Sequence, residues 1–298
     1  MFRGSIVALV TPMTADGALD FAALDRLLEF HVEAGTDAVV IAGTTGEAPT
    51  LDPGELEELV ARAVAACDGR IPVIGGSGTN CTGKTVELTR RLARAGAEAA
   101  LVVTPYYNKP PQRGLDAHYR KVADEGGLPV IMYNVPGRTG CDLLPETAAV
   151  LAGHPGIVGL KEAVPDMARL ARLRELCPDG LSLLSGDDGS ALDFILGGGH
   201  GVISVTANAA PRLMKGMCQA ALDREERKAR MLDERLRPLH AALFCEPNPI
   251  PVKWAVHRLG LIEAGIRLPL VWMAVEYEQR VAAAMETAGL LDDSGATS

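Results

Sequence analysis

The 298-residue sequence predicts an α/β protein, a TIM (β/α)8 barrel with a small C-terminal helical extension. Eight short and continuously apolar segments recur along the chain, as expected for strands that are buried on both faces of a parallel sheet. Amphipathic segments with helical spacing lie between them. Aromatic residues make up only 4% of the chain against 48% hydrophobic residues, so the core is expected to consist of Ala, Leu, Val and Ile.

The expected strands follow one another at intervals of roughly 20 to 35 residues, which is typical of βα units. They cover residues 6–10, 38–41, 72–74, 100–103, 129–132, 157–160, 181–184 and 201–204. Asp20 and the pair Asp52–Pro53 are expected to begin the first two intervening helices, and Gly35 to follow the end of the first.

More helical sequence follows the eighth strand than one βα unit needs. Helices are predicted over 211–222, 223–243, 249–259 and 268–288. We therefore expect a barrel domain over 1–224 and a C-terminal helical domain over 225–298. The last residues, 292–298, form a polar tail that is expected to fray.

Composition excludes several classes of protein. The net charge of −9 argues against a nucleic acid or an anionic membrane surface as partner. The sequence has no run of about 18 apolar residues that could span a bilayer, and its first residues lack a basic region followed by a cleavable apolar stretch, so we do not expect secretion. Six scattered cysteines without a C-x-x-C pair favour a reducing, cytoplasmic location over a disulfide framework or a zinc site.

Polar residues follow the expected strands, which is where a barrel carries its chemistry. They occupy 43–47, 104–108, 133–140, 161–163 and 185–188. Lys161 is the most informative, because it ends a buried strand in a chain with only seven Lys against 22 Arg. An apolar site favours the neutral and nucleophilic form of a lysine amine, which suits Schiff-base formation with a ketone. The alternative is an ion pair with Glu162 at the rim, and position alone leaves both open.

Three further groups fit a Schiff-base reaction. Tyr133 ends the neighbouring strand and could move protons at an imine, although it could equally be a rim aromatic. Thr44 and Thr45 lie between glycines that let backbone N–H groups approach a carboxylate, or that simply form a tight turn. Arg138 could bind a substrate carboxylate or be a solvated surface residue.

Residues 78–85 read GTNCTGKT and match the phosphate-binding pattern G-x-x-x-x-G-K-[ST]. The match follows the third strand rather than an early one, and no strand ends in an obvious Asp partner for magnesium. We therefore disfavour a nucleotide-binding protein with a doubly wound sheet.

Taken together, these motifs resemble the dihydrodipicolinate synthase family, and the resemblance extends from about residue 4 to 290. The motifs are GTTGE, TPYYN, YNVP, RTG, GLKEA, LSGDD, GHGVIS and NPIPVK. The resemblance implies condensation of pyruvate with L-aspartate 4-semialdehyde, without a metal or organic cofactor, in the diaminopimelate route to lysine.

The resemblance also implies residue roles. Lys161 would form the imine, and Tyr133 would act as its acid and base. Thr44 and Tyr107 would complete a proton relay, with Tyr107 reaching into a neighbouring subunit. The other implied contacts are Thr45 with the pyruvate carboxylate, Arg138 with the semialdehyde carboxylate, and Gly186 and Ile203 as lining residues. A homotetramer built as a dimer of dimers is implied as well.

One departure concerns feedback by lysine. In lysine-inhibited members, His and Glu side chains occupy positions that are Pro53, Leu56 and Lys84 here. A cation at residue 84 repels the ammonium group of lysine, so weak or no inhibition is expected. We also expect Lys84 to lie on a loop at a subunit interface. Two other hypotheses remain besides the nucleotide-binding one: an aldolase acting on a sugar acid, and a barrel without activity that serves as a binding protein.

Overall fold

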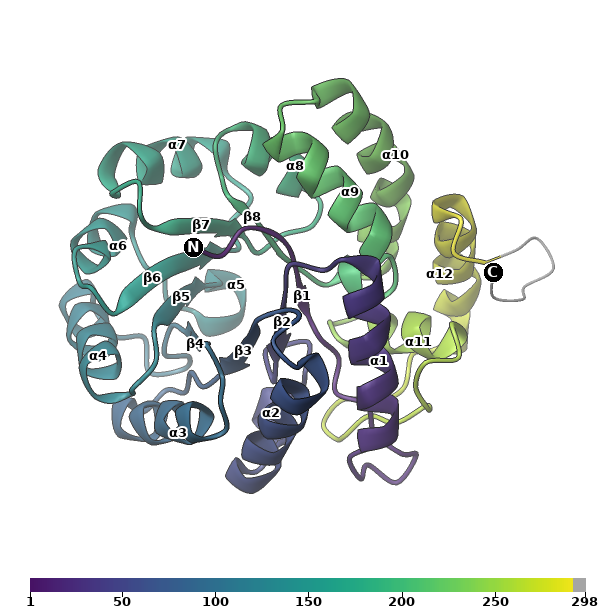
Figure 1. The fold of residues 1–298 in the computed structure, drawn as a ribbon, viewed down its shortest axis with the longest axis horizontal. Helices are drawn as coiled ribbons and strands as arrows, with labels where there is room; N and C mark the ends of the chain where they lie inside the picture. The colour runs from purple at the N-terminus through teal and green to yellow at the C-terminus, as the bar shows by residue number, and fades with distance from the viewer. Residues whose placement is uncertain (292–298) are drawn as a thin grey trace.

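The computed structural model describes residues 1–291 and contains a closed barrel of eight parallel strands in chain order. The strands are β1 (Gly4–Ala8), β2 (Ala38–Ile41), β3 (Val73–Gly76), β4 (Ala99–Val103), β5 (Val130–Asn134), β6 (Ile157–Glu162), β7 (Ser182–Ser185) and β8 (Gly201–Ser204). The ring closes where β1 pairs with β8, with Ile6 opposite Ile203. The predicted fold class is confirmed (Figure 1).

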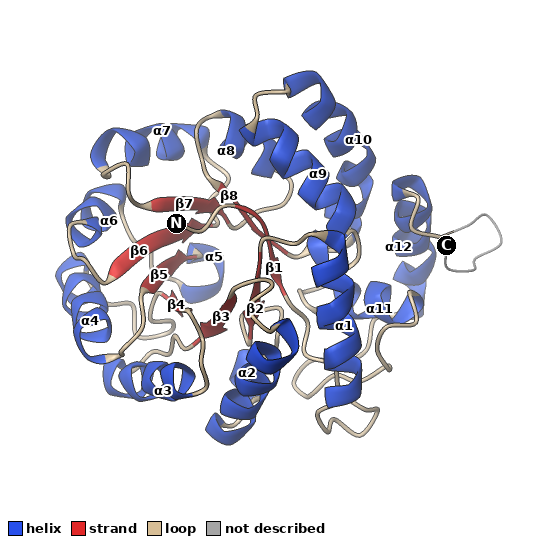
Figure 2. Ribbon diagram, viewed as in Figure 1, coloured by secondary structure: helices blue, strands red, loops and turns tan. Residues whose placement is uncertain are grey.

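Helices surround this barrel, as Figure 2 shows. They are α1 (Phe21–Ala34), α2 (Pro53–Cys67), α3 (Thr82–Arg94), α4 (Gln112–Glu125), α6 (Pro145–Ala152), α7 (Met167–Leu176), α8 (Ala191–Leu196) and α9 (Pro211–Leu222). The Asp20 carboxylate caps α1 as predicted, and Asp52 forms a reciprocal capping box with Glu55 at the start of α2. Three shorter helices lie in loops: α5 (Pro136–Thr139), η1 (Ala48–Thr50) and η2 (Thr206–Asn208).

Strands β5 and β6 extend further than the sequence predicted. Their ladder continues through Tyr133 opposite Lys161 and Asn134 opposite Glu162. Residues that were expected just beyond the strands are therefore held within the sheet. Because successive strand residues point to opposite faces, Tyr133 and Lys161 share one face while Asn134 and Glu162 share the other.

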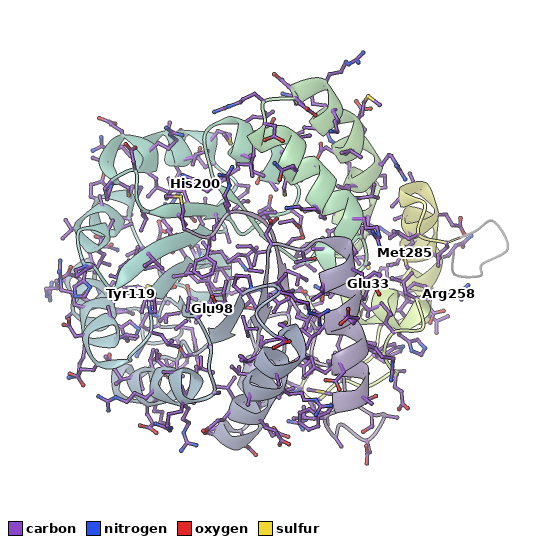
Figure 3. All side chains as sticks on the ribbon, in the orientation of Figure 1. Glu33, Glu98, Tyr119, His200, Arg258 and Met285 are labelled. Carbon is purple, nitrogen blue, oxygen red and sulfur yellow. The ribbon has the colours of Figure 1, made fainter. Side chains whose placement is uncertain are left out.

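The core is aliphatic, both inside the barrel and beneath the helices. The interior cluster is Ile6, Ala8, Ala38, Val40, Ile74, Ala99, Leu101, Ile131, Tyr133, Leu184 and Ile203. Four aromatic residues in the described part of the chain are buried as well, namely Tyr119, Tyr133, Phe194 and Trp254, and Tyr119 on α4 (labelled in Figure 3) is fully buried. Its hydroxyl donates a hydrogen bond to the Val102 carbonyl at 3.0 Å, which satisfies the one polar group that this ring buries.

The C-terminal extension consists of α10 (Glu226–Ala242), α11 (Ile250–Arg258) and α12 (Val275–Ala288), to one side of the barrel in Figure 1. Its buried side chains belong to the same hydrophobic cluster as those of α1 and α9. The helix predicted over 268–288 begins only at Val275, after Ala274, whose backbone is extended and whose N–H donates to the Glu246 carboxylate at 3.0 Å. The domain division at residue 224 stays a prediction, and the tail 292–298 lies outside the described residues.

Within residues 1–291, none of the helices combines the length and the apolar character that crossing a membrane requires. In the same part of the chain, His, Cys, Asp and Glu side chains do not gather in a group of three or more that could hold a metal ion.

Candidate active site

A cavity of about 440 Å³ opens at the carboxyl ends of β2 to β5, where a barrel is expected to carry its site. Thr44, Tyr133 and Arg138 line it, so three of the predicted site residues come together there. The other predicted site residues do not line it: Lys161, Thr45, Gly186, Ile203 and Tyr107. The rest of the wall is largely apolar and includes Ala48, Pro49, Pro53, Leu56, Leu88 and Tyr106.

Lys161 lies directly behind Tyr133. The two residues are register partners on β6 and β5, and the Lys161 amine is 4.2 Å from the centroid of the Tyr133 ring. Both are nearly buried, with exposed fractions of 5% and 6%. An amine held over a phenol at the base of a cavity has a nucleophile and a proton-transfer group in contact, which is the pairing that imine chemistry needs.

The Glu162 carboxylate is bound elsewhere, so the alternative of a Lys161–Glu162 ion pair is wrong. Glu162 accepts hydrogen bonds from Arg169 at 2.8 Å and from the Asn134 amide at 3.1 Å, on the outer face of the barrel. Burial raises the pKa of Glu162, and the nearby positive charge of Arg169 opposes this shift. Arg169 also binds Asp142 through two hydrogen bonds of 2.8 and 3.0 Å, which closes a polar network behind Tyr133 and Lys161.

The turn after β2 carries the two threonines. Thr44 is half-buried and lines the cavity, whereas Thr45 is 2% exposed. The Thr45 hydroxyl accepts a hydrogen bond of 3.1 Å from the side-chain amide of Asn248. Because a hydroxyl can donate while it accepts, Thr45 retains a proton for a ligand oxygen.

Arg138 and Tyr107 lie on the loops after β5 and β4. Arg138 is on the short helix α5, is exposed, and donates a hydrogen bond of 3.4 Å to the Asn248 carbonyl. Its guanidinium therefore lies beside the cavity and can reach an anion there. Tyr107 is 88% exposed, with its backbone in the left-handed region at φ 73°. This chain alone leaves the Tyr107 ring outside its own cavity.

Gly186 and Ile203 pack around the lysine and the barrel interior. A Cβ atom at Gly186 would lie 3.0 Å from the Cε atom of Lys161 and 2.8 Å from the Cβ atom of Ala163. Any larger residue there would displace the amine stem. Ile203 is 1% exposed and belongs to the interior cluster with Tyr133.

In the segment that matches the phosphate-binding pattern, the final threonine forms a hydrogen bond within the protein. The Thr85 side chain is buried and accepts a hydrogen bond from the Thr79 backbone N–H at 3.0 Å. The closed barrel also rules out the doubly wound sheet that the nucleotide-binding hypothesis required. Lys84 lies in the first turn of α3 and is exposed, so our placement of this residue on a loop is corrected.

Sequence reasoning gave no separate role to an ion pair beneath the Thr44–Thr45 turn. Glu47 and Lys253 are joined at 2.5 Å, with both side chains fully buried. Burial lowers the pKa of Lys253, while the Glu47 carboxylate opposes this shift. A signal was available, because Lys253 lies in an apolar stretch like the one that drew attention to Lys161.

A closed parallel barrel with a largely apolar cavity at its carboxyl end and a buried lysine against a tyrosine defines an enzyme of the (β/α)8 type. Residues 1–288 match the model of the dihydrodipicolinate synthetase family. The chain belongs to this family, and it is a lyase.

Individual relatives agree over almost their whole length. The 4-hydroxy-tetrahydrodipicolinate synthase of Methylococcus capsulatus is 56% identical over 291 residues, covering 98% of this chain and all of the relative. The enzyme of the same name from Alcanivorax borkumensis is 54% identical, covering 98% and 99%. The solved structure of the chloride-inhibited dihydrodipicolinate synthase from Acinetobacter baumannii, complexed with pyruvate, is 47% identical with a TM-score of 0.96, covering 98% and 100%.

Proposed function

We propose that this enzyme condenses pyruvate with L-aspartate 4-semialdehyde through a Schiff base on Lys161, to give 4-hydroxy-tetrahydrodipicolinate in the diaminopimelate route to lysine. The observation that carries the proposal is the 4.2 Å contact between the Lys161 amine and the Tyr133 ring, while Arg169 and Asn134 occupy the carboxylate of Glu162. The names of the relatives support the same substrates.

The chemistry proceeds in three stages. The Lys161 amine attacks C2 of pyruvate, and the carbonyl oxygen leaves as water to form the imine. Loss of a methyl proton gives an enamine, whose carbon attacks the aldehyde carbon of the semialdehyde while the aldehyde oxygen takes up a proton. The amino group of the joined product then attacks the imine carbon, which closes the ring and releases the Lys161 amine.

The surrounding residues bind substrate and move protons. Tyr133 transfers protons at the imine, and Thr44 with Tyr107 connects it to solvent. Thr45 holds the pyruvate carboxylate and Arg138 that of the semialdehyde. Gly186 and Ile203 leave room around the reacting carbon. The reaction needs no metal or organic cofactor, since the protonated imine itself withdraws electrons.

The 88% exposure of Tyr107 supports an oligomer in which a second copy covers this ring. We propose a homotetramer in the cytoplasm, built as a dimer of dimers, in which Tyr107 of one copy completes the relay of another. Oligomeric state is measured by analytical ultracentrifugation. A fully active monomer would contradict the role given to Tyr107.

The test of the reaction is borohydride reduction in the presence of pyruvate, followed by peptide mass mapping. We expect pyruvate to be attached to Lys161 in the wild type. The adduct is expected to be absent from a Lys161→Met variant and to be retained in a Lys228→Met variant, which replaces an exposed lysine. Absence of any adduct would refute a Schiff-base enzyme. Turnover with aspartate semialdehyde, compared with cleavage of sialic acid or a deoxy-keto acid, separates the synthase from a sugar-acid aldolase.

Weak inhibition by lysine is part of the same proposal. Lys84 lies in the first turn of α3, where the positive end of the helix dipole adds to its own charge. The charge of Lys84 and the positive end of the helix dipole both disfavour the binding of a cationic ligand nearby. Initial rates measured against L-lysine are expected to change little at millimolar concentration, and inhibition at micromolar lysine would contradict the proposal.

A further inference from the structure

The C-terminal extension contacts the turn that carries Thr44 and Thr45 through a buried ion pair. Lys253 on α11 donates to one oxygen of the Glu47 carboxylate at 2.5 Å, and the backbone N–H of Arg267 donates to the other at 3.1 Å. Glu47 is the last residue of the turn after β2. The pair joins residues 206 positions apart in the sequence, so it ties the extension directly to the barrel mouth.

The turn needs such support because of its backbone. Ala42 before it and Glu47 at its end both adopt the left-handed conformation, at φ 54° and 58°. Each non-glycine residue in this region carries a strain of about 1 to 3 kcal/mol and persists only where the surroundings hold it. Glu47 is held by its two partners in the extension, and the turn is held with it.

Asn248 provides a second connection from the same segment. Its side-chain amide donates to the Thr45 hydroxyl at 3.1 Å, and its carbonyl accepts from Arg138 at 3.4 Å. One residue of the extension therefore contacts both of the groups to which we assign a substrate carboxylate. Asn248 is 6% exposed, and its contact with Thr45 is buried, whereas its contact with Arg138 is only partly buried.

Arg267 fixes the far end of this segment. Its guanidinium binds the Glu55 carboxylate through two hydrogen bonds of 2.6 and 2.7 Å, and it also donates to the Thr50 carbonyl at 2.8 Å. Segment 248–267 is thus fastened to η1 and α2, the two helices that directly follow the turn that it supports. Such a bidentate pair gives geometric definition as well as energy.

Stability alone is a poor explanation for the buried pair. Removing two charges from water costs about as much as their attraction returns, and neutral replacements of buried pairs are often as stable. We infer that Lys253 and Asn248 are positioning residues, which hold the Thr44–Thr45 turn in the geometry that binds pyruvate. This inference rests on the proposed function, in which Thr45 holds the pyruvate carboxylate.

The test is a double-mutant cycle with Lys253→Met, Glu47→Gln and the two combined. Lys253→Met leaves the Glu47 charge buried without its partner, and we expect both a lower Tm and a pyruvate KM raised about ten- to a hundredfold. Combining it with Glu47→Gln removes the unpaired charge. The double variant is therefore expected to recover most of the Tm while its pyruvate KM stays raised.

A matched control is Lys228→Met on α10, where the lysine forms an exposed ion pair with Glu225; its Tm and KM are expected to match the wild type. Recovery of both Tm and pyruvate KM in the double variant, or an unchanged KM in both variants, would overturn the inference and leave a structural role only. If Lys253→Met fails to fold, the pyruvate KM of the double variant still distinguishes a positioning role from a structural one. Borohydride trapping in the wild type keeps the two proposals separate, because a missing adduct there refutes the proposed function instead.

Discussion

The network behind the catalytic lysine makes a sharp prediction for Arg169→Met. Arg169 has only 11% of its side chain exposed and donates to Glu162, to Asp142 and to the Leu143 carbonyl. The substitution keeps most of the apolar stem but leaves Glu162, with 2% of its side chain exposed, without a charged partner. Breaking a buried pair from one side costs about 3 to 5 kcal/mol, and we expect that loss in the free energy of unfolding at neutral pH.

The loss is expected to depend on pH. Burial raises the pKa of Glu162 above its ordinary value of 4.5, and removing Arg169 takes away the charge that opposes this shift. A carboxyl with a raised folded pKa binds more protons when folded, so its contribution to stability is greatest below the unfolded pKa and declines as pH rises through the folded pKa. The pKa of Glu162 is raised further in the variant than in the wild type. The loss in free energy of unfolding caused by Arg169→Met is therefore expected to be smaller near pH 5 than near pH 8.

The free energy of unfolding of the wild type and of Arg169→Met is measured by urea unfolding at pH 5 and pH 8, at a fixed protein concentration. The matched control is Arg172→Met on the same helix, where an arginine with 44% of its side chain exposed pairs with Glu146 and Glu175. Exposed pairs contribute about 0 to 1 kcal/mol, so this control is expected to stay close to the wild type at either pH. Equal losses for the two variants, or a deficit for Arg169→Met that does not change with pH, would refute the reasoning.

Three other predictions concern the site. In Gly186→Ala the new methyl group meets the Lys161 stem at 3.0 Å, so borohydride trapping with pyruvate is expected to slow at least about tenfold; the control Gly180→Ala meets open space and keeps the wild-type rate. Tyr107→Phe is expected to lower kcat about a hundredfold or more with an unchanged Tm, because it keeps the ring that a second copy is proposed to cover and removes only the hydroxyl; a wild-type kcat would contradict the relay. Arg138→Ala is expected to raise the semialdehyde KM far more than it slows adduct formation, and equal effects on both would show that its assigned role is wrong.

The sequence predicted the barrel because its signals are local. Apolar runs, helix caps and polar residues after the strands all act within a few positions, and the Asp20 and Asp52 caps formed as expected. The same logic brought Lys161 and Tyr133 together, since neighbouring parallel strands end at the same edge. Family resemblance added roles that composition and spacing left open, above all for Tyr107, Gly186 and Ile203.

Long-range partners carried no comparable signal. The Thr45–Asn248 contact spans 203 residues, and nothing near either position marks the other. The choice of Arg169 rather than Lys161 as the partner of Glu162 depends on which face of β6 each side chain takes, and strand length had to be known first. The late start of α12 is also accompanied by a distant contact, because the Ala274 backbone N–H just before the helix donates to the Glu246 carboxylate 28 residues away.

The alternation of Lys161 and Glu162 along β6 also constrains how this strand can change over evolutionary time. A single residue deleted earlier in the strand would turn the amine to the outer face, where the Arg169 network lies, and bring a carboxylate to the Tyr133 ring, because a slip of one residue exchanges the two faces of a strand. Both reaction and fold would be lost in one step. Divergence in β6 is therefore expected to proceed by replacement of side chains at constant length, while the loops on either side vary in length.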